Sequence, residues 1–598
     1  MIFNTENVDF DITSAKIDVV MEAIKKENPG FCQIFIYYSS IDKIREEIYN
    51  YFYRFELHCL QSCNMNSVQR FYSQQALRVI KNLFSPRHEK ISHFSLLRSI
   101  QKCLNNDYSS VSLGLVYEVL FLFRSLKGTN GLEQFVEEKA VMKHFEWGSL
   151  DLISQEVKQW IKRYPSGLNE TVIKQRINNK DFLKEKYNIT DKEWYDWDWQ
   201  RNHVITDISS LESLLELTGE EKEAIQLAND NEIPFGITPY YLSLLALNGE
   251  NKEYEHSVRT QALPLLSCVK HAIEMKKQNR TANTNTYRKI PPEISITRGY
   301  PMIAIFKPMQ TNSRFFCLYG ERNWEINYAL KNKNLINMDK IDRAIRWFKR
   351  HKEVTEVLLT GDIIIFDDII IENILSLLAD IPHIQRIRVS TRIPVMLPIR
   401  ITDSLVHLLS SYQISGRREI SLMTHFEHAY EVTVEAMKGI QKLKKAGIQV
   451  YNQSIYTMEN ARRFEMAALR KQLRLIGVDP YYSYNAARKD VLEDRVPIAR
   501  MIQEQNEESR LAPGIDRADE AVFNIPGVGK NYLRAAQEHE LIMILADGSR
   551  IYQFYPSDVY LVNKKPFLYR DVPIYSFLSQ LADKGEDLKA YQSIWYYY

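Results

Sequence analysis

Two polar tripeptides, each directly after a β-branched apolar run, carry the side chains best placed to bind a ligand. TGD at 360–362 follows the run 354–359, and STR at 390–392 follows the run 384–389. Between them, residues 369–378 have the apolar period of a helix. A strand–helix–strand unit forms a right-handed parallel crossover, so both tripeptides are expected at the carboxyl ends of neighbouring strands. Parallel α/β sheets and barrels bind their ligands at that edge.

The elements that would position these tripeptides alternate between strands and helices. Strands are predicted near 302–306, 354–359, 384–389, 420–423, 448–453 and 478–484. Helices are predicted at 338–352, 369–378, 403–412, 432–446 and 460–476. Six β/α units fall short of the eight of a closed barrel, so the predicted fold class is α/β, a partial (β/α)6 TIM-like barrel. From residue 521 the pattern predicts a loop and a hairpin that turns at Asp547 and Gly548.

The remaining residues divide into further segments. Residues 1–190 are predicted to be a helical N-terminal extension of unknown role, and 191–292 a helical lead-in. The barrel is expected over 293–500, and the C-terminal loop and hairpin over 501–598. A protein partner that docks on the N-terminal helices is one hypothesis for the extension. Self-association into a homo-oligomer is another.

Composition bounds the class of protein. A chain of 598 residues is too long for a single core, so roughly two to four domains are expected. A net charge of +2 gives no general electrostatic reason to bind nucleic acid or an anionic membrane. The N-terminus carries acids where a signal peptide carries bases. The longest apolar run, 113–123, contains Glu118 and is too short to span a bilayer. These features predict a cytoplasmic protein.

The six cysteines are scattered, and none follows Cys317. A large chain with no export signal argues against a disulfide framework. Cys59 and Cys63 stand four residues apart, a spacing that could form half of a metal site. One helix turn of small apolar residues is the favoured interpretation of this pair.

Several longer motifs resemble those of lysine 2,3-aminomutase and its relatives. The likeness runs from about Trp194 to Pro556, and its motifs keep their order and spacing. They are WYDWDWQRN at 194–202, ITPYYLSLL at 237–245, TGD at 360–362, RIPVMLPIRIT at 392–402, THFEH at 424–428, YNQS at 451–454, DPYYSYN at 479–485 and PGVGK at 526–530. The chain is thereby identified as similar to a family of radical S-adenosylmethionine (SAM) enzymes, which have a partial β/α barrel.

The resemblance implies a specific chemistry. Members of the family cleave SAM with a 4Fe-4S cluster, while pyridoxal phosphate (PLP) carries the substrate amine through a 1,2-amino shift. Three thiolates spaced C-x3-C-x2-C, in a loop after the first barrel strand, hold three of the four irons. A lysine holds PLP as a Schiff base, and the cofactor delocalises electrons.

The loop that should hold the cluster departs from this pattern. It spans 314–327, RFFCLYGERNWEIN, and contains one cysteine. If Cys317 is the first ligand, Glu321 and Trp324 occupy the second and third positions. Aligning Tyr319 with the tyrosine that usually precedes the second cysteine leaves no thiolate at any of the three positions. One thiolate cannot hold a cubane, so the sequence predicts that the 4Fe-4S cluster is absent. Cys317, the only remaining candidate ligand of the cluster loop, is predicted not to bind metal.

The groups that would recognise the substrate are replaced as well. The arginine that grips the substrate carboxylate would fall on Glu325 or Ile326. The acidic pair that recognises the distant amine of the substrate would fall on Ala487 and Asn524. Because a buried ammonium needs a paired carboxylate, lysine is a poor candidate substrate.

A set of ligand-binding residues survives at the expected edge of the sheet. Asp362 matches the family residue that accepts hydrogen bonds from the methionyl amine of SAM, and Gly361 permits close approach of the backbone. Arg392, His425 and Gln453 fall on other strand ends of the same edge. Together these five residues form a predicted SAM site. Taken singly, Asp362 also suits a helix N-terminus, Arg392 an ion pair, and His425 a hydrogen-bonded core position.

Lys530 matches the position of the lysine that binds PLP. The glycines of PGVGK would let this loop approach the cofactor, although the motif is one residue shorter than the glycine run of the family. A turn that carries a solvated lysine is the alternative. The arginines expected around the cofactor phosphate are missing, and Lys307 or Arg298 are their candidate substitutes.

Three functions remain open. The first is a non-radical homologue, a pseudoenzyme that binds SAM or an amino acid at the barrel mouth in a ligand-binding or regulatory role. The second is an active aminomutase, an isomerase that uses SAM and PLP. The third is a cluster-free PLP enzyme that acts through Lys530. Loss of the cluster ligands favours the first, and whether the chain is an enzyme stays open.

Overall fold

The computed structural model describes residues 12, 14–61, 65, 67–129, 147–231, 233, 235–247, 255–277, 288–289, 295–308, 338–485, 495–525, 529–533, 539–556 and 565–598. At its centre is a ten-stranded sheet whose strands follow one another in sequence order. The strands are β1 (Arg288–Lys289), β2 (Ile296–Arg298), β3 (Ile303–Phe306), β4 (Glu356–Leu359), β5 (Arg386–Ser390), β6 (Glu419–Thr424), β7 (Gln449–Tyr456), β8 (Asp479–Asn485), β9 (Glu520–Ile525) and β10 (Gly529–Tyr532). Neighbours from β3 to β9 are parallel, and the two edges are antiparallel.

The predicted α/β class is confirmed, and each of the six predicted strands is present. The prediction of a loop from residue 521 was wrong at its start, because β9 continues the parallel sheet next to β8. This strand was hard to recognise because its apolar residues form a short continuous run, which periodicity cannot distinguish from other buried segments. The hairpin after it is confirmed as β11 (His539–Ile544) and β12 (Arg550–Phe554), with Gly548 in the left-handed region at φ 85°.

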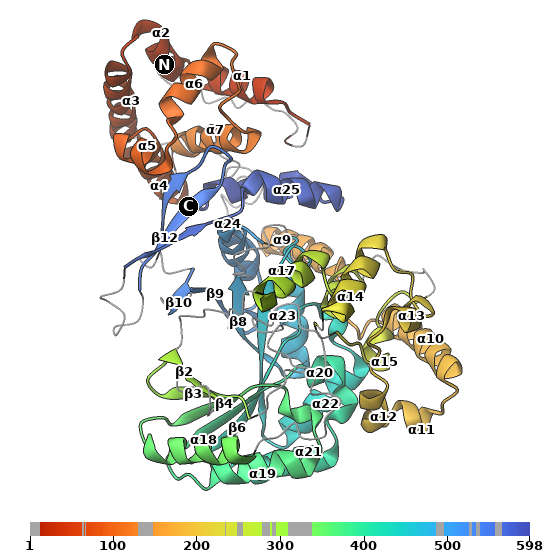
Figure 1. The fold of residues 1–598 in the computed structure, drawn as a ribbon. Coiled ribbons are helices and arrows are strands. Elements are labelled where there is room, and N and C mark those ends of the chain that lie inside the picture. The colour runs from red at the N-terminus through yellow and green to blue at the C-terminus, as the bar shows by residue number, and fades with distance from the viewer. Residues whose placement is uncertain are drawn as a thin grey trace.

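The sheet curves until its first and last strands approach each other (Figure 1). Tyr300, in the turn between β2 and β3, has its ring centroid 5.5 Å from Nζ of Lys530 on β10. The strand pairing of the described residues joins no strand of one edge to the other, so the sheet is open there. Its assignment as a partial barrel stays a prediction.

Helices cover the outer face of this sheet, as the apolar periods predict (Figure 1). They are α18 (Met338–Arg350), α19 (Asp368–Ala379), α21 (Asp403–Ser411), α22 (Val434–Lys445) and α23 (Glu465–Ile476). On β4, Val357 and Leu359 are fully buried, whereas the alternate residue Leu358 is half-buried on the other face. The alternation leaves one face for packing against helices and the other for a site. Thr402 caps α21, because its hydroxyl accepts the N–H of Leu405 at 3.2 Å.

The N-terminal residues form a helical body that lies against the C-terminal part of the chain (Figure 1). Its helices are α1 (Ile17–Glu27), α2 (Pro29–Tyr37), α3 (Ile41–Gln61), α4 (Ser67–Leu83), α5 (Pro86–Ser92), α6 (Leu96–Leu104) and α7 (Leu113–Lys127). Glu118 of α7 forms a buried ion pair with Arg550 of β12 at 2.8 Å. Arg550 also donates to the carbonyl of Trp595 at 2.8 Å, so one guanidinium ties α7, β12 and the C-terminal tail together.

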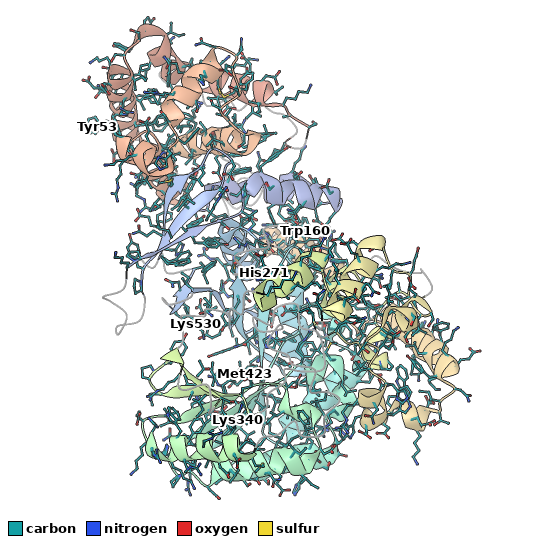
Figure 2. The ribbon with its side chains drawn as sticks, viewed as in Figure 1. Tyr53, Trp160, His271, Lys340, Met423 and Lys530 are labelled. Atoms are coloured by element: carbon teal, nitrogen blue, oxygen red, sulfur yellow. The ribbon has the colours of Figure 1, made fainter. Side chains whose placement is uncertain are left out.

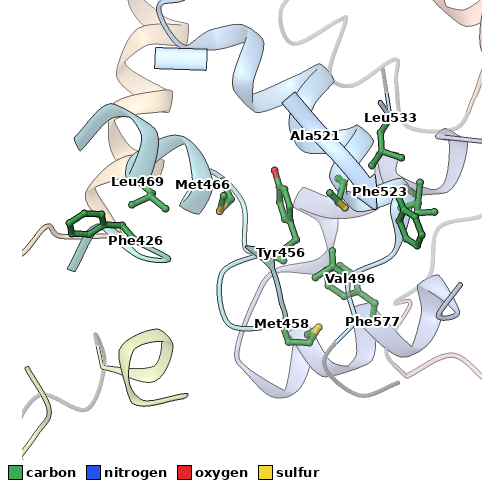
Figure 3. Close-up of a cluster of buried hydrophobic side chains, with 14 of the residues drawn as sticks. Phe426, Tyr456, Met458, Met466, Leu469, Val496, Ala521, Phe523, Leu533 and Phe577 are labelled. Atoms are coloured by element: carbon green, nitrogen blue, oxygen red, sulfur yellow. The ribbon is translucent and has the colours of Figure 1, made fainter. Parts of the chain in front are cut away.

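A second helical segment follows this body in the chain, and most of it lies beside the sheet near α20 (Ile393–Met396) and α22 (Figure 1). It contains α9 (Trp147–Lys162), α10 (Glu170–Tyr187), α11 (Asp191–Trp194), α12 (Trp197–Asn202), α13 (Ile208–Glu212), α14 (Gly219–Asp230), α15 (Pro239–Leu242), α16 (His256–Ala262) and α17 (Leu266–Lys277). The C-terminal region adds α24 (Ile498–Gln503), β13 (Phe567–Arg570) and α25 (Ile574–Asp583). Figure 3 shows the apolar core that joins these parts, with Tyr456, Met466, Phe523 and Phe577 in one cluster. In the ranges that the structure describes, no helix combines the length and apolar character needed to cross a membrane.

Candidate functional site

The two tripeptides lie together at the carboxyl ends of β4 and β5. Gly361 and Asp362 both have positive φ, 93° and 53°, a conformation that glycine adopts freely and aspartate tolerates. The turn directs the Asp362 carboxylate towards the next strand, where it accepts hydrogen bonds from the Thr391 hydroxyl and, at 3.3 Å, from the backbone N–H of Arg392. The carboxylate therefore holds the loop after β5 at the carboxyl edge of the sheet.

Arg392 is buried beside the carboxylate of Glu431, which lies outside the quoted motifs. Its Nη2 lies 3.6 Å from Oε1 of Glu431, which follows β6. Tyr241, in the segment 237–245, donates its hydroxyl to the same oxygen at 2.7 Å. Tyr241 and Glu431 lie within or next to the quoted motifs, so their positions carried a signal, but no motif indicated that the two residues meet.

His425 lies at the same edge of the sheet, directly after β6, and its imidazole is neutral. Burial, and then the positive charge of Arg392, lower the pKa of its imidazole to about 4, although a hydrogen bond to the backbone of Gln453 opposes the shift. A neutral ring next to a guanidinium can accept or donate a hydrogen bond but carries no charge.

Glu427, two residues further on, is another group that sequence reasoning missed. Its Oε2 accepts the backbone N–H of Ile455 at 2.9 Å. Burial raises the pKa of this carboxyl well above its usual value, and the nearby Glu431 adds to the rise, while the Ile455 N–H and Arg392 oppose it. Burial therefore favours the protonated, uncharged form of the Glu427 carboxyl. We call Asp362, Arg392, His425, Glu427 and Glu431 the rim.

Lys530 lies on β10, on the face of the sheet that the helices leave uncovered (Figure 2). It pairs with Asn524 of β9, so both side chains share one face. Its Nζ lies 4.1 Å from the ring centroid of Tyr482 and 5.9 Å from that of Tyr484, both on β8. With Tyr300, three aromatic rings surround the amine, an arrangement that stabilises a cation.

Gln453 connects the rim with Lys530. It lies on β7 directly beside Tyr482 of β8, and the pair shares one row of the sheet with Glu520 of β9. The His425 ring is hydrogen-bonded to the Gln453 backbone, and the Tyr482 ring lies under the Lys530 amine. The residues predicted for SAM and the lysine predicted for PLP are thus joined by three neighbouring strands.

Some predicted residues lie outside the described residues. These include Cys317 with the whole loop 309–337, Cys63, residues 526–528 of the PGVGK motif and Ala487. Within the described ranges, no group of three or more His, Cys, Asp or Glu side chains could hold a metal ion. Arg298, a candidate phosphate ligand, instead pairs with Glu353 at 3.0 Å. Cys32 and Cys103 are buried in the N-terminal body, where burial raises the pKa of each thiol to about 11.

A separate cavity of about 550 Å³ opens at the other ends of the strands. Its lining includes Glu356 and Arg386 at the amino ends of β4 and β5, together with Arg417 in the loop before β6. Arg386 is already ion-paired, to Glu356 at 3.0 Å and to Glu419 at 2.6 Å. The cavity contains none of the rim residues.

Comparison with known proteins gives the context for this arrangement. No family model matches the chain. An uncharacterised KamA family protein of Methanocaldococcus jannaschii is 35% identical over 564 residues, which cover 89% of this chain and 90% of that protein. An L-lysine 2,3-aminomutase of Acetoanaerobium sticklandii is 31% identical over 326 residues, or 54% of this chain and 74% of the relative. A glutamate 2,3-aminomutase of Clostridioides difficile is 30% identical over 301 residues, or 50% of this chain and 67% of the relative.

The first of these similarities extends over nearly the full length of both proteins, and the others cover about half of this chain. The same motifs that form the rim and the Lys530 strand underlie the predicted resemblance, which these comparisons confirm. The chain belongs to the KamA family and is related to the lysine 2,3-aminomutases.

Proposed function

We propose that the chain is a non-radical member of the KamA family that binds SAM or an amino acid at the rim. The observation that carries the proposal is the composition of the loop 314–327, which has one cysteine where a cluster would need three. A radical generator needs that cluster as its electron source. A ligand-binding or regulatory role requires the rim alone.

The rim residues suit such a ligand chemically. Asp362 supplies a carboxylate for an ammonium group, and Arg392 supplies a guanidinium for a carboxylate. His425 and Gln453 add neutral polar groups beside them. Together these groups match the two charged ends of the amino-acid part of SAM.

Metal analysis combined with calorimetry tests this proposal. We expect protein that is reconstituted with iron and sulfide without oxygen to hold no stoichiometric 4Fe-4S cluster, and SAM to bind in an isothermal titration. Asp362→Asn should weaken SAM binding about tenfold, because it removes a charge-assisted hydrogen bond. Asp403→Asn, an exposed acid on α21, is the control that should leave it unchanged. One cluster per chain, or formation of 5′-deoxyadenosine from SAM, would favour an active aminomutase instead.

The surroundings of Lys530 favour a second candidate function, cluster-free PLP chemistry. PLP bound as a Schiff base would delocalise electrons from a substrate carbon. The three tyrosine rings fit an aromatic cofactor next to the amine, and Asn524 offers it a carboxamide. An aldimine absorption band that disappears in Lys530→Ala would support this function. A protein that stays colourless after incubation with PLP would exclude it.

A further inference from the structure

One carboxyl oxygen of Glu427 is buried and forms no hydrogen bond with the described residues. The residue is 2% exposed, and its Oε2 accepts the Ile455 N–H at 2.9 Å. Its other oxygen, Oε1, is buried and has no hydrogen-bond partner among the described residues. Most buried polar atoms in folded proteins are paired, so this oxygen at the rim is a candidate contact for a ligand.

The charged groups around Glu427 contribute to the shift in the pKa of its carboxyl. Its own backbone N–H donates to Oε2 of Glu431 at 2.7 Å, and the charge of Glu431 acts on the Glu427 carboxyl. Among the described residues, the guanidinium of Arg392 opposes this charge, and it lies 3.6 Å from Glu431. Asn460 of the segment after β7 adds a neutral amide 3.5 Å from Oε2. A single positive charge can balance one of the two carboxylates, and Glu431 has the closer contact.

The remaining charged neighbours are already engaged with one another. His428 follows Glu427 in the chain, and its Nε2 lies 3.1 Å from Glu465 at the start of α23. Glu465 also accepts from Arg462 at 3.1 Å. Asp362, across the rim, is bonded to the loop after β5. None of these pairs is directed at Oε1 of Glu427.

The position of Glu427 relates it to the predicted ligand site. His425 is bonded to the backbone of Gln453, and Glu427 is bonded to the backbone of Ile455. The two side chains therefore take successive places along β7, two residues apart both on β7 and in the segment after β6. Glu427 is the next group along the rim from His425.

We propose, on the basis of the ligand site proposed above, that Glu427 donates its carboxyl O–H to an uncharged acceptor on the ligand. A ring nitrogen or a hydroxyl oxygen of the adenosine part of SAM is such an acceptor. Glu427 is thus a specificity residue that selects the nucleoside end, whereas Asp362 and Arg392 bind the amino-acid end. The raised pKa of Glu427 supports this role, because it favours the protonated form that carries the donor.

Calorimetric titration with SAM between pH 6 and pH 10 tests the role. Glu427→Gln keeps a donor at every pH, and Glu427→Ala removes it. We expect wild-type affinity to fall more steeply with pH than that of Glu427→Gln, because the ligand ammonium loses its proton in both proteins and the Glu427 proton leaves only in the wild-type chain. At pH 7, Glu427→Ala should bind SAM about three- to tenfold more weakly than the wild-type chain. Glu435→Gln, an acid on α22 that pairs with Arg176, is the matched control and should follow the wild-type profile.

The outcomes distinguish a failure of the role proposed for Glu427 from a failure of the proposed function. If the wild-type chain binds SAM and Glu427→Ala binds it equally well at all pH values, the role of Glu427 is wrong and the proposed function stands. If Glu427→Gln follows the wild-type pH profile, a different group titrates and the role is again wrong. Should the wild-type chain bind no SAM, the proposed function fails and this role fails with it. Melting temperatures of each variant identify any loss of affinity that comes from unfolding.

Discussion

Buried charges occur in two regions of the molecule, and they are balanced differently. In one region, the buried side chains of Arg463, Arg470 and Arg500 form ion pairs with four acids. The N–O distances lie between 2.6 and 3.0 Å, and the acids are Glu504, Glu507, Glu508 and Asp519. We call these seven residues the arginine cluster. At the rim, Arg392 faces Glu427 and Glu431 in the part of the chain that the structure describes, and burial and the charge of Glu431 raise the pKa of Glu427.

The difference indicates what each region does. In the arginine cluster the pKa values of Arg463 and Arg470 are raised above their usual value by the neighbouring carboxylates despite burial, so the charges hold the fold together. At the rim, burial raises the pKa of the Glu427 carboxyl, and its Oε1 has no hydrogen-bond partner among the described residues. Charges that pair with one another suit a structural role, whereas a carboxyl with a shifted pKa at the ends of the strands is a candidate for ligand binding.

Removing an arginine from the cluster should have the largest effect on stability. Arg470→Ala leaves Glu504 and Asp519 buried without their guanidinium, so we expect the free energy of unfolding to fall by about 3–5 kcal/mol. Urea denaturation measures this, with the exposed Arg417→Ala as a control that should change it by less than about 0.5 kcal/mol. A loss below about 1 kcal/mol for Arg470→Ala would contradict the structural role of the cluster.

Asp571, next to the cluster, is an exception that pH should reveal. Burial raises its pKa to about 7, while hydrogen bonds from Ile498 and Val572 and the charges of Arg550 and Arg495 oppose the rise. Because the folded pKa lies above the unfolded value, stability from this group is present at low pH and is lost as the pH rises from about 4 to about 7. The full change is at most about 4 kcal/mol. Urea midpoints of the wild-type chain should fall over that range relative to those of Asp571→Asn, and parallel curves would show that Asp571 is ionised normally.

The aromatic environment of Lys530 should have a moderate effect. Tyr482→Phe keeps the ring under the amine, whereas Tyr482→Leu removes it. We expect Tyr482→Leu to be less stable than Tyr482→Phe by about 1 kcal/mol at pH 7, because a cation–π contact and aromatic packing are lost. Thermal denaturation compares the two variants. Equal stabilities would mean that the Lys530 amine gains nothing from the ring.

Exposed ion pairs on the outer helices should have the smallest effect. Lys442 and Asp403 lie 2.9 Å apart, with side chains 42% and 90% exposed. Lys442→Ala should lower the free energy of unfolding by less than about 0.5 kcal/mol, since solvent screens the pair. Denaturation in low and high salt measures this. A larger loss would show that contact distance alone, rather than burial, decides the contribution of charge in this protein.

Local pattern was sufficient to predict much of the sheet. The strands β3 to β8 and the helices between them were predicted from apolar period and turn residues, because both depend on neighbours in the sequence. The strand β9 escaped because its short apolar run has no distinctive period, and its assignment depends on pairing with β8. The meeting of Asp362 with Thr391 followed from the crossover rule, since both stand after parallel strands.

The sequence by itself determined the alternation of strands and helices, the residue types at the strand ends and the single cysteine of the loop 314–327. Tertiary structure alone decided that Tyr241 and Arg392 converge on Glu431, and that one oxygen of Glu427 has no hydrogen-bond partner among the described residues. The physical reason is how far apart in the sequence the interacting groups lie. Secondary structure follows from interactions a few residues apart, whereas the balance of buried charge depends on groups that only the fold brings within a few ångströms.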